Sequence, residues 1–352
     1  MLRIGVIGYG YWGPNVVRNF AIQQDCRVTT ICDSDPAALA RARIQYPAAQ
    51  TVTHASEIVT SPKIDAVAIV TPVSAHHELA RQALEHGKHI FVEKPFTATS
   101  EQAEDLIELA ERKKLVIMVD HTFLFTGAVR KMKELIDQGV LGRLYYYDST
   151  RVNLGLFQHD VNVVWDLAPH DLSIMDHLIG MEPERVVATG QAHLNGFEDI
   201  AYITLYFPNS VTAHINVNWL SPVKVRSTLV GGERKMLFWN DLEPTEKVKI
   251  YDKGVVLETK QGIYNLLVSY RSGDMWAPRV EQTEALEIEA RYFLHCIDTG
   301  QRPFNDGRAG LRVVSMLEAA QKSLKRGGEP VSIGPSQQRT TIAGPGAFAP
   351  ID

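Results

Sequence analysis

The sequence predicts an α/β protein with a doubly wound parallel sheet first and a second, mainly antiparallel sheet after it. In the first third, short runs rich in Val and Ile alternate with helical patterns. Such uninterrupted apolar strands are typical of a parallel sheet buried on both faces. Further along, polar and apolar residues alternate, which indicates strands with one buried face. We expect one domain over 1–121, a second over 122–334, and a flexible tail over 335–352 that is rich in Pro, Gly and Ala.

Strands and helices alternate through the first domain, as in doubly wound folds. The strands are expected at 3–8, 27–33, 65–72, 89–95 and 115–121, and the helices at 13–24, 36–46, 74–87 and 99–114. In this architecture the ligand lies outside the carboxyl ends of the strands. Residues that follow a strand are therefore the first candidates for a binding site.

A glycine-rich turn, "GYGYWG", follows the first strand and opens the first helix. Its glycines allow the backbone to approach a pyrophosphate at the positive helix N-terminus. Asp33, at the end of the second strand, can accept hydrogen bonds from ribose hydroxyls and would repel a 2′-phosphate. No Arg or Lys follows in "DSDPAA", so NAD is favoured over NADP. The residues expected at the cofactor here are Gly8, Gly10, Tyr11, Trp12, Gly13 and Asp33.

Two further strand ends border the same crevice. Thr71 and Pro72 follow the strand at 65–72, and His76 opens the next helix, either as a cofactor contact or as an ordinary helix-start histidine. Glu93 and Lys94 leave the strand at 89–95. Because a residue before proline is pushed into an extended conformation, Lys94 should project from a fixed turn. The alternative is a solvated lysine that closes a loop.

The segment "NVVWDLAPHDLS" at 162–173 places Asp166 four residues before His170. Residues at this spacing share one face of a helix. Proline costs little in the first turn, where backbone N–H groups have no intrahelical acceptor. Pro169 therefore predicts a helix that begins near Asp166 and presents both polar side chains at its open end. The alternative is a capped structural helix with a satisfied histidine.

The second domain shows the alternating pattern of an antiparallel sheet. Its strands are expected at 143–153, 201–208, 210–220, 225–232 and 234–241, with a hairpin-like turn at "FPNSV". Large apolar and aromatic residues occur on both faces of these strands. We therefore expect the outer face to pack against a second copy, in a homodimer or homotetramer.

Taken together, "GVIGYGYWG", "DAVAIVTP", "GKHIFVEKPF" and the D-x-x-x-H element resemble the Gfo/Idh/MocA oxidoreductase family over nearly the full length. The resemblance implies a Rossmann domain, an α/β domain with a large open sheet, and NAD(P)-linked oxidation or reduction of sugars, cyclitols or their derivatives. It also implies that Lys94 lies beside the reacting carbon, that His170 accepts a proton, and that Asp166 orients His170. Val163, Val164 and Trp165 replace the glycines usual before the acid.

The resemblance further implies that His121, Arg151 and Asn153 lie near the substrate. Arg151 could clamp a phosphate or carboxylate, or it could be a cross-strand surface arginine. The motifs "GYWGPNVVRNF" and "WDLAPHDLS" are similar to members that oxidise C3 of UDP-N-acetylhexosamines. Two alternatives remain: a ketosugar reductase or inositol dehydrogenase with the same groups, and a regulator that senses dinucleotide without catalysis.

Composition excludes several other classes. The 36 Lys and Arg against 41 Asp and Glu give a formal charge of −5, which argues against nucleic acid or an anionic membrane as partner. Three cysteines, an odd and sparse set without a close-spaced metal pair, fit a reducing compartment. No signal-peptide pattern and no apolar run long enough to span a bilayer are found, so a cytoplasmic location is expected. No His or Cys spacing indicates a metal site.

Overall fold

The computed structural model describes residues 1–155, 160–257 and 268–334, so the predicted tail at 335–352 lies outside the described residues. The chain forms two compact units. The first contains Met1–Phe125 together with Thr283–Ser315, and the second contains Thr126–Gln282 and the described residues from Met316 on. The expected continuous second domain over 122–334 is therefore wrong in one respect, because a late segment returns to the first unit.

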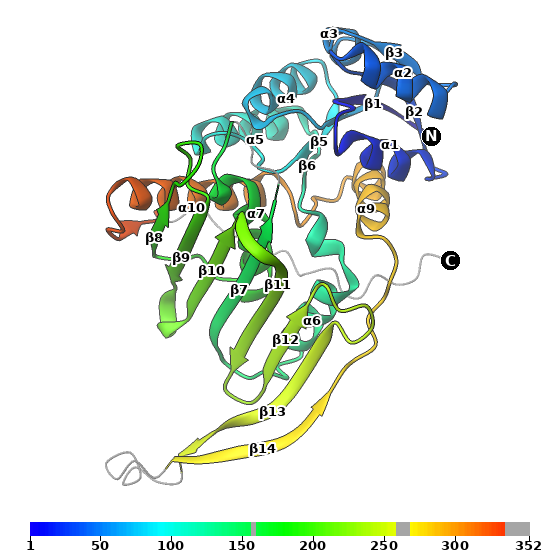
Figure 1. Ribbon diagram of the computed structural model, residues 1–352. Helices are drawn as coiled ribbons and strands as arrows, with labels where there is room; N and C mark the ends of the chain where they lie inside the picture. The colour runs from blue at the N-terminus through cyan, green and yellow to red at the C-terminus, as the bar shows by residue number, and fades with distance from the viewer. Residues whose placement is uncertain (156–159, 258–267, 335–352) are drawn as a thin grey trace. The chain divides into compact units, whose positions relative to one another are not determined.

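The sheet of the first unit is parallel and has the order β3-β2-β1-β4-β5-β6 (Figure 1). Its strands are β1 (Leu2–Ile7), β2 (Cys26–Cys32), β3 (Gln50–Val52), β4 (Ala66–Ile69), β5 (His89–Glu93) and β6 (Ile117–Asp120). The three-residue β3 is too short to give a periodic signal and was not predicted. The doubly wound fold is confirmed, and its first turn, between β1 and α1, lies at the carboxyl edge of the sheet.

The helices of the first unit follow the predicted alternation. They are α1 (Gly13–Ala21), α2 (Pro36–Gln45), α3 (Ser56–Val59), α4 (His76–Glu85), α5 (Ser100–Lys113) and α9 (Ala285–Thr299), with short 3-10 turns η1 (Val73–Ala75) and η2 (Thr122–Phe125). The late helix α9 packs against α1 and β5 through three aromatic rings. Phe293 lies 6.1 Å from Phe20 and 5.7 Å from Phe91, centroid to centroid, in edge-to-face geometry. These contacts explain why α9 belongs to the first unit.

The second unit is built on a nine-stranded sheet of order β14-β13-β12-β11-β7-β10-β9-β8-β15. Only the β10–β7 pair is parallel, so the sheet is mixed and mainly antiparallel, as expected. The strands are β7 (Leu144–Leu154), β8 (Arg185–Gln191), β9 (Ile200–Tyr206), β10 (Thr212–Asn218), β11 (Leu220–Gly232), β12 (Met236–Asn240), β13 (Val248–Leu257), β14 (Val268–Trp276) and β15 (Val331–Ser332).

One face of this sheet is covered and the other is open. The helix α7 (Val163–Ile179) packs on β7, β9 and β10 (Figure 1), where side chains such as Ile203 and Ile215 are fully buried. On the other face Tyr202 and Leu229 keep 44% and 40% of their surface exposed. The remaining elements are α6 (Gly127–Asp137), η3 (Pro208–Ser210) and α10 (Gly307–Lys325), which begins in the first unit and ends in the second. Within the described ranges, no helix is both long and apolar enough to cross a bilayer.

Candidate cofactor and catalytic elements

The glycine-rich turn of the first unit has the close backbone packing that only glycine allows. Gly8 has φ +100°, and a Cβ there would lie 2.2 Å from the carbonyl oxygen of Val70. A Cβ on Gly13 would lie 2.2 Å from the carbonyl oxygen of Gly8. At Gly10 nothing lies within 4 Å of the Cβ position, which leaves open space above the turn. This arrangement fits a pyrophosphate at the start of α1.

Asp33 follows β2 and is held beside this turn by two backbone amides. Its Oδ2 accepts from the N–H of Tyr9 at 2.6 Å, and its Oδ1 accepts from the N–H of Asp35 at 2.8 Å. A carboxylate oxygen has two lone pairs, so both oxygens can still accept from ribose hydroxyls. The second acid, Asp35, makes the turn unfavourable for a 2′-phosphate. The residues present therefore fit NAD.

Thr71 and Pro72 follow β4 at the same edge. The hydroxyl oxygen of Thr71 is buried and has no hydrogen-bond partner among the described residues, which suits a site completed by a ligand. The side chain of His76, at the start of α4, is completely buried. Its Nδ1 lies 2.9 Å from the carbonyl oxygen of Pro95 and its Nε2 lies 2.8 Å from that of Thr71.

His76 thus bridges two loops of the crevice, and its direct contact with the cofactor stays a prediction. Burial lowers the pKa of His76, while the backbone carbonyls oppose this shift. A neutral imidazole can donate only one N–H. When the ring is neutral, only one of its two contacts with carbonyl oxygens can therefore be an N–H···O hydrogen bond.

Glu93 and Lys94 leave the sheet at the end of β5. Glu93 pairs in register with Asp120 at the end of β6. The Lys94–Pro95 peptide is cis, and Lys94 is partly exposed at the carboxyl edge. In the glycine-rich turn, Tyr11 is 88% exposed, whereas the indole Nε1 of Trp12 donates to Asp120 Oδ2 at 3.0 Å.

Asp120 was missed by the sequence analysis, although it precedes His121, which was selected. An acid at the carboxyl end of a parallel strand was the available signal. Asp120 and His121 are 1% and 2% exposed. His121 lies in the first unit, immediately after β6.

In the second unit, α7 begins at Val163 and not near Asp166. The side chain of Asn162 caps it, with Oδ1 accepting from the N–H of Trp165 at 3.1 Å. Pro169 is consequently inside the helix, where it cannot donate to the carbonyl of Trp165. The predicted first-turn position of Pro169 is wrong. The predicted common face of Asp166 and His170 fits the helix, and both side chains are partly exposed.

A buried tryptophan holds the acid of this pair. The indole Nε1 of Trp219, which is 1% exposed between β10 and β11, donates to Asp166 Oδ2 at 3.1 Å. Sequence reasoning did not find this contact, since 53 residues separate the two positions. Asp166 is therefore fixed from the sheet side.

Arg151 occupies a buried ion pair. Its Nε lies 2.6 Å from Asp171 Oδ2 and its Nη2 lies 3.3 Å from Asp171 Oδ1, with the two side chains 4% and 3% exposed. The alternative of a surface arginine is wrong, and the guanidinium fork is engaged by Asp171. Asn153, two residues on along β7, is partly exposed. The burial pattern places its side chain on the same face of the sheet as Arg151.

The predicted residues are therefore distributed over two units. The first contains the glycine-rich turn, Asp33, Thr71, Pro72, His76, Glu93, Lys94 and His121, and the second contains Arg151, Asn153, Asp166 and His170. Among the residues that the structure describes, no three His, Cys, Asp or Glu side chains form a group that could hold a metal ion.

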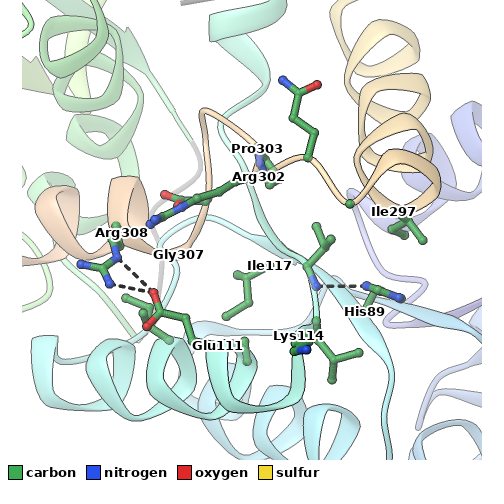
Figure 2. Close-up of a pocket in the computed structure, with 16 residues that line it drawn as sticks. His89, Glu111, Lys114, Ile117, Ile297, Arg302, Pro303, Gly307 and Arg308 are labelled. Carbon is green, nitrogen blue, oxygen red and sulfur yellow. Dashed lines mark hydrogen bonds and ion pairs between the residues drawn. The ribbon is translucent and has the colours of Figure 1, made fainter. Parts of the chain in front are cut away.

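A separate cavity of about 300 Å³ lies at the opposite edge of the first sheet (Figure 2). It is bordered by His89, where β5 begins, by Ile117, where β6 begins, and by the loop before α10. Figure 2 shows Glu111 paired with Arg308 at its rim. Since the dinucleotide turn lies at the carboxyl edge, this cavity is not part of the cofactor site.

Comparison with known proteins supplies the decisive observation. Residues 2–121 match the model of the oxidoreductase family with an NAD-binding Rossmann fold, GFO_IDH_MocA, and residues 129–238 match the GFO/IDH/MocA C-terminal domain. The chain belongs to the Gfo/Idh/MocA family. It is an NAD-binding oxidoreductase with the two-sheet fold of that family.

Individual Gfo/Idh/MocA relatives match almost end to end. The UDP-N-acetylglucosamine 3-dehydrogenase of Acidithiobacillus ferrooxidans is 28% identical over 89% of this chain and 94% of that protein. Its solved structure has a TM-score of 0.77 at 25% identity and covers 93% of this chain and 98% of that chain. The myo-inositol 2-dehydrogenase of Thermotoga maritima is 23% identical over 92% of this chain and 96% of that protein.

Proposed function

We propose that this protein is an NAD-dependent sugar dehydrogenase that oxidises a secondary alcohol, at C3 of a nucleotide-linked sugar. The observation that carries the proposal is the Asp166–His170 face of α7, where a buried indole fixes the acid beside the histidine. Lys94 at the carboxyl edge of the first sheet supports it. Similarity over most of the chain to a UDP-N-acetylglucosamine 3-dehydrogenase supports the substrate class.

Each residue has a stated role in this reaction. Bound NAD would accept the hydride. His170 takes the hydroxyl proton, since histidine suits proton transfer near neutral pH. Asp166 orients the imidazole, and Lys94 stabilises the negative charge that develops on the substrate oxygen. The glycine-rich turn and Asp33 hold the pyrophosphate and the ribose, with Thr71 and Pro72 beside them.

The substrate contacts are revised by the buried ion pair. We assign Arg151 to anchoring α7 on β7, because Asp171 engages its guanidinium. His121 and Asn153 remain the proposed substrate contacts. The proposed enzyme is a cytoplasmic homodimer or homotetramer, supported by three buried free thiols and by the open face of the second sheet.

An inositol dehydrogenase is the second candidate, since the myo-inositol 2-dehydrogenase of Thermotoga maritima also matches over 92% of this chain. A ketosugar reductase would use the same groups in the reverse direction. A non-catalytic regulator is disfavoured because Lys94, Asp166 and His170 occur together.

The test is NADH formation with a panel of UDP-N-acetylhexosamines, free hexoses and inositols. We expect turnover of a UDP-sugar, and loss of turnover in Lys94→Ala and His170→Ala with NAD binding retained. Turnover of inositol alone would replace the first candidate by the second. NAD binding without turnover of any compound, with Lys94→Ala unchanged, would favour the regulator.

A further inference from the structure

Three carboxyl groups converge at the carboxyl edge of the first sheet. Glu93 and Asp120 end neighbouring strands as register partners, so their side chains leave the same face. The third acid, Glu289, lies one helical turn before Phe293 on α9, the helix whose aromatic side chain packs on Phe91 of that face. Asp120 is 1% exposed and Glu289 is completely buried. Sequence analysis had no reason to connect residues 120 and 289.

The two buried acids have unequal hydrogen-bond environments. Asp120 accepts from the indole of Trp12 at 3.0 Å and also from the hydroxyl of Thr122. Lys94 lies close enough for its charge to favour the Asp120 carboxylate. Glu289 Oε1 accepts from the amide of Asn305 at 3.0 Å, and the side chains of Asp120 and Thr122 also interact with the Glu289 carboxyl group. Its Oε2 has no partner within normal hydrogen-bond distance among the described residues, although it is buried.

This inequality decides where the negative charge resides. Removing a carboxylate from water costs several kcal/mol unless donors or cations compensate. Asp120 has the donors of Trp12 and Thr122, a nearby ammonium and the Glu289 carboxyl as a hydrogen-bond partner. Glu289 has the amide of Asn305 and a weaker interaction with Thr122, and no cation among the causes that act on it. Burial raises the pKa of Glu289 well above its usual range. The charge of Asp120, its hydrogen bond with Glu289 and the charge of Glu93 raise this pKa further, and only Thr122 opposes the shift among the causes that act on it. Burial also raises the pKa of Asp120, but hydrogen bonds with Thr122, Trp12 and Glu289 and the charge of Lys94 oppose that shift.

We propose that Glu289 is a protonated positioning residue of the NAD site. Because the carboxyl group of Glu289 is neutral, Asp120 carries the negative charge of this buried pair. The Asp120 carboxylate holds Trp12 of the glycine-rich turn in place and lies near the charge of Lys94. Loss of the proton would put a second buried anion beside Asp120 and Glu93. The resulting repulsion disturbs the turn that receives the pyrophosphate, so NAD binding is linked to one proton on Glu289.

The proposal rests on NAD as cofactor and not on the identity of the substrate. All its groups lie in the first unit: Trp12 before α1, Glu93 and Lys94 after β5, Asp120 and Thr122 after β6, and Glu289 and Asn305 from α9 and the loop that follows it. Asn305 also donates to the carbonyl of Val119 at 2.8 Å, which ties the position of Glu289 to the end of β6.

The decisive variant is Glu289→Gln, because glutamine mimics the neutral acid, can donate to Asp120, and can still accept from Asn305. The matched control is Glu287→Gln on the same helix, where the acid is part of a partly exposed i,i+4 pair with Arg291. Two measurements are made on the full-length protein: the infrared carbonyl band of protonated carboxyl groups at neutral pH, and the Kd of NAD from neutral to alkaline pH.

We expect the wild type and Glu287→Gln to show a protonated carboxyl band that Glu289→Gln lacks. Above the pKa of Glu289, wild-type Kd should rise about tenfold per pH unit, as linkage to one proton requires. This rise should be absent in Glu289→Gln, whose neutral-pH Kd should stay within about threefold of wild type. Asp120→Asn should shift the wild-type band, because the acceptor of the Glu289 proton changes.

Three results would overturn the proposal. One is an identical infrared spectrum in the wild type and Glu289→Gln. Another is the same pH dependence of Kd in both. The third is loss of NAD binding by a folded Glu289→Gln protein at neutral pH, which would mean that Glu289 acts as an anion. None of these measurements depends on finding the sugar substrate, so failure of the proposed function would leave them interpretable.

Discussion

At the scale of single residues, the contact between Trp219 and Asp166 explains how the acid of the proposed catalytic pair is held on its helix. The indole donates to one carboxylate oxygen from the sheet below. The acid is therefore positioned before any ligand arrives, as an orienting group requires. Removing only the N–H tests this without removing the acid.

Trp219→Phe should lower kcat of the proposed dehydrogenase by roughly tenfold to a hundredfold, the usual cost of losing a hydrogen bond to a charged group. KM should change much less, since no substrate contact is removed. Trp239→Phe is the control, because Trp239 is another buried tryptophan of the same sheet, 2% exposed. Equal effects of the two variants on kcat would assign Trp219 to packing alone.

Glu289 also predicts how stability changes with pH. A group whose pKa is raised by folding contributes stability that is complete below its unfolded pKa and is lost as pH rises through its folded pKa. For Glu289 this loss of stability begins near pH 4.5, the ordinary pKa of the group, and continues as the pH rises toward its raised folded-state pKa. Glu289→Gln should therefore gain unfolding free energy relative to wild type as pH rises, at up to about 1.4 kcal/mol per pH unit. Urea unfolding at several pH values measures this, and parallel curves would contradict it.

Sequence alone located the residues whose roles depend on local geometry. Gly8, Gly13 and Asp33 each lie in a turn expected between a strand and a helix, because these elements fix them within a short segment. Their contact with the cofactor stays a prediction. Arg151 and His76 were located, but their partners were not. Asp171 and the Thr71 and Pro95 carbonyls become visible only after folding.

At the scale of elements, helix α7 begins earlier than the position of Pro169 predicted. Proline is tolerated at the start of a helix, and on that basis the sequence predicted a start near Asp166. The structure begins the helix at Val163 because Asn162 caps it and because Val163 and Val164 are completely buried. Burial of Val163 and Val164 therefore extends the helix toward its N-terminus, beyond the start that the proline alone would predict.

Pro169→Ala restores an N–H that can donate to the carbonyl of Trp165. Because proline costs about 3 kcal/mol in a helix interior, the variant should unfold at a higher urea concentration. The gain in unfolding free energy is reduced by the packing contacts that the buried proline ring provides. Turnover should fall at the same time, since Pro169 lies between Asp166 and His170 and straightening the helix moves one relative to the other. Urea unfolding and steady-state kinetics are both needed. Higher stability with unchanged turnover would show that the proline has no role in the alignment.

At the scale of the molecule, we propose that the subunit interface of the predicted oligomer lies on the open face of the second sheet. Leu229 pairs in register with Phe238 of β12 and with Asp148 of β7, which places it well inside the face. Tyr202 stacks on His214 of the same face. Alternation along the strands predicted this face, but β8, β13, β14 and the two-residue β15 were not predicted.

Leu229→Arg should convert the proposed oligomer to monomers, because a buried unpaired charge at an interface costs several kcal/mol. Light scattering during size-exclusion chromatography measures the mass. Val223→Arg is the control for an added charge, because Val223 lies on an exposed segment of β11 and is 63% exposed. An unchanged mass for Leu229→Arg would place the interface elsewhere or leave the protein monomeric.

The return of α9 to the first unit has a consequence for biosynthesis. A nascent chain that has emerged only as far as Phe125 has all six parallel strands, yet it lacks Phe293 against Phe20 and Phe91 and has no Glu289 beside Asp120. About 160 more residues must leave the ribosome before the nucleotide-binding half can close its own core. An early stop codon after the last of these strands would therefore release an incomplete, aggregation-prone polypeptide in place of a small working domain.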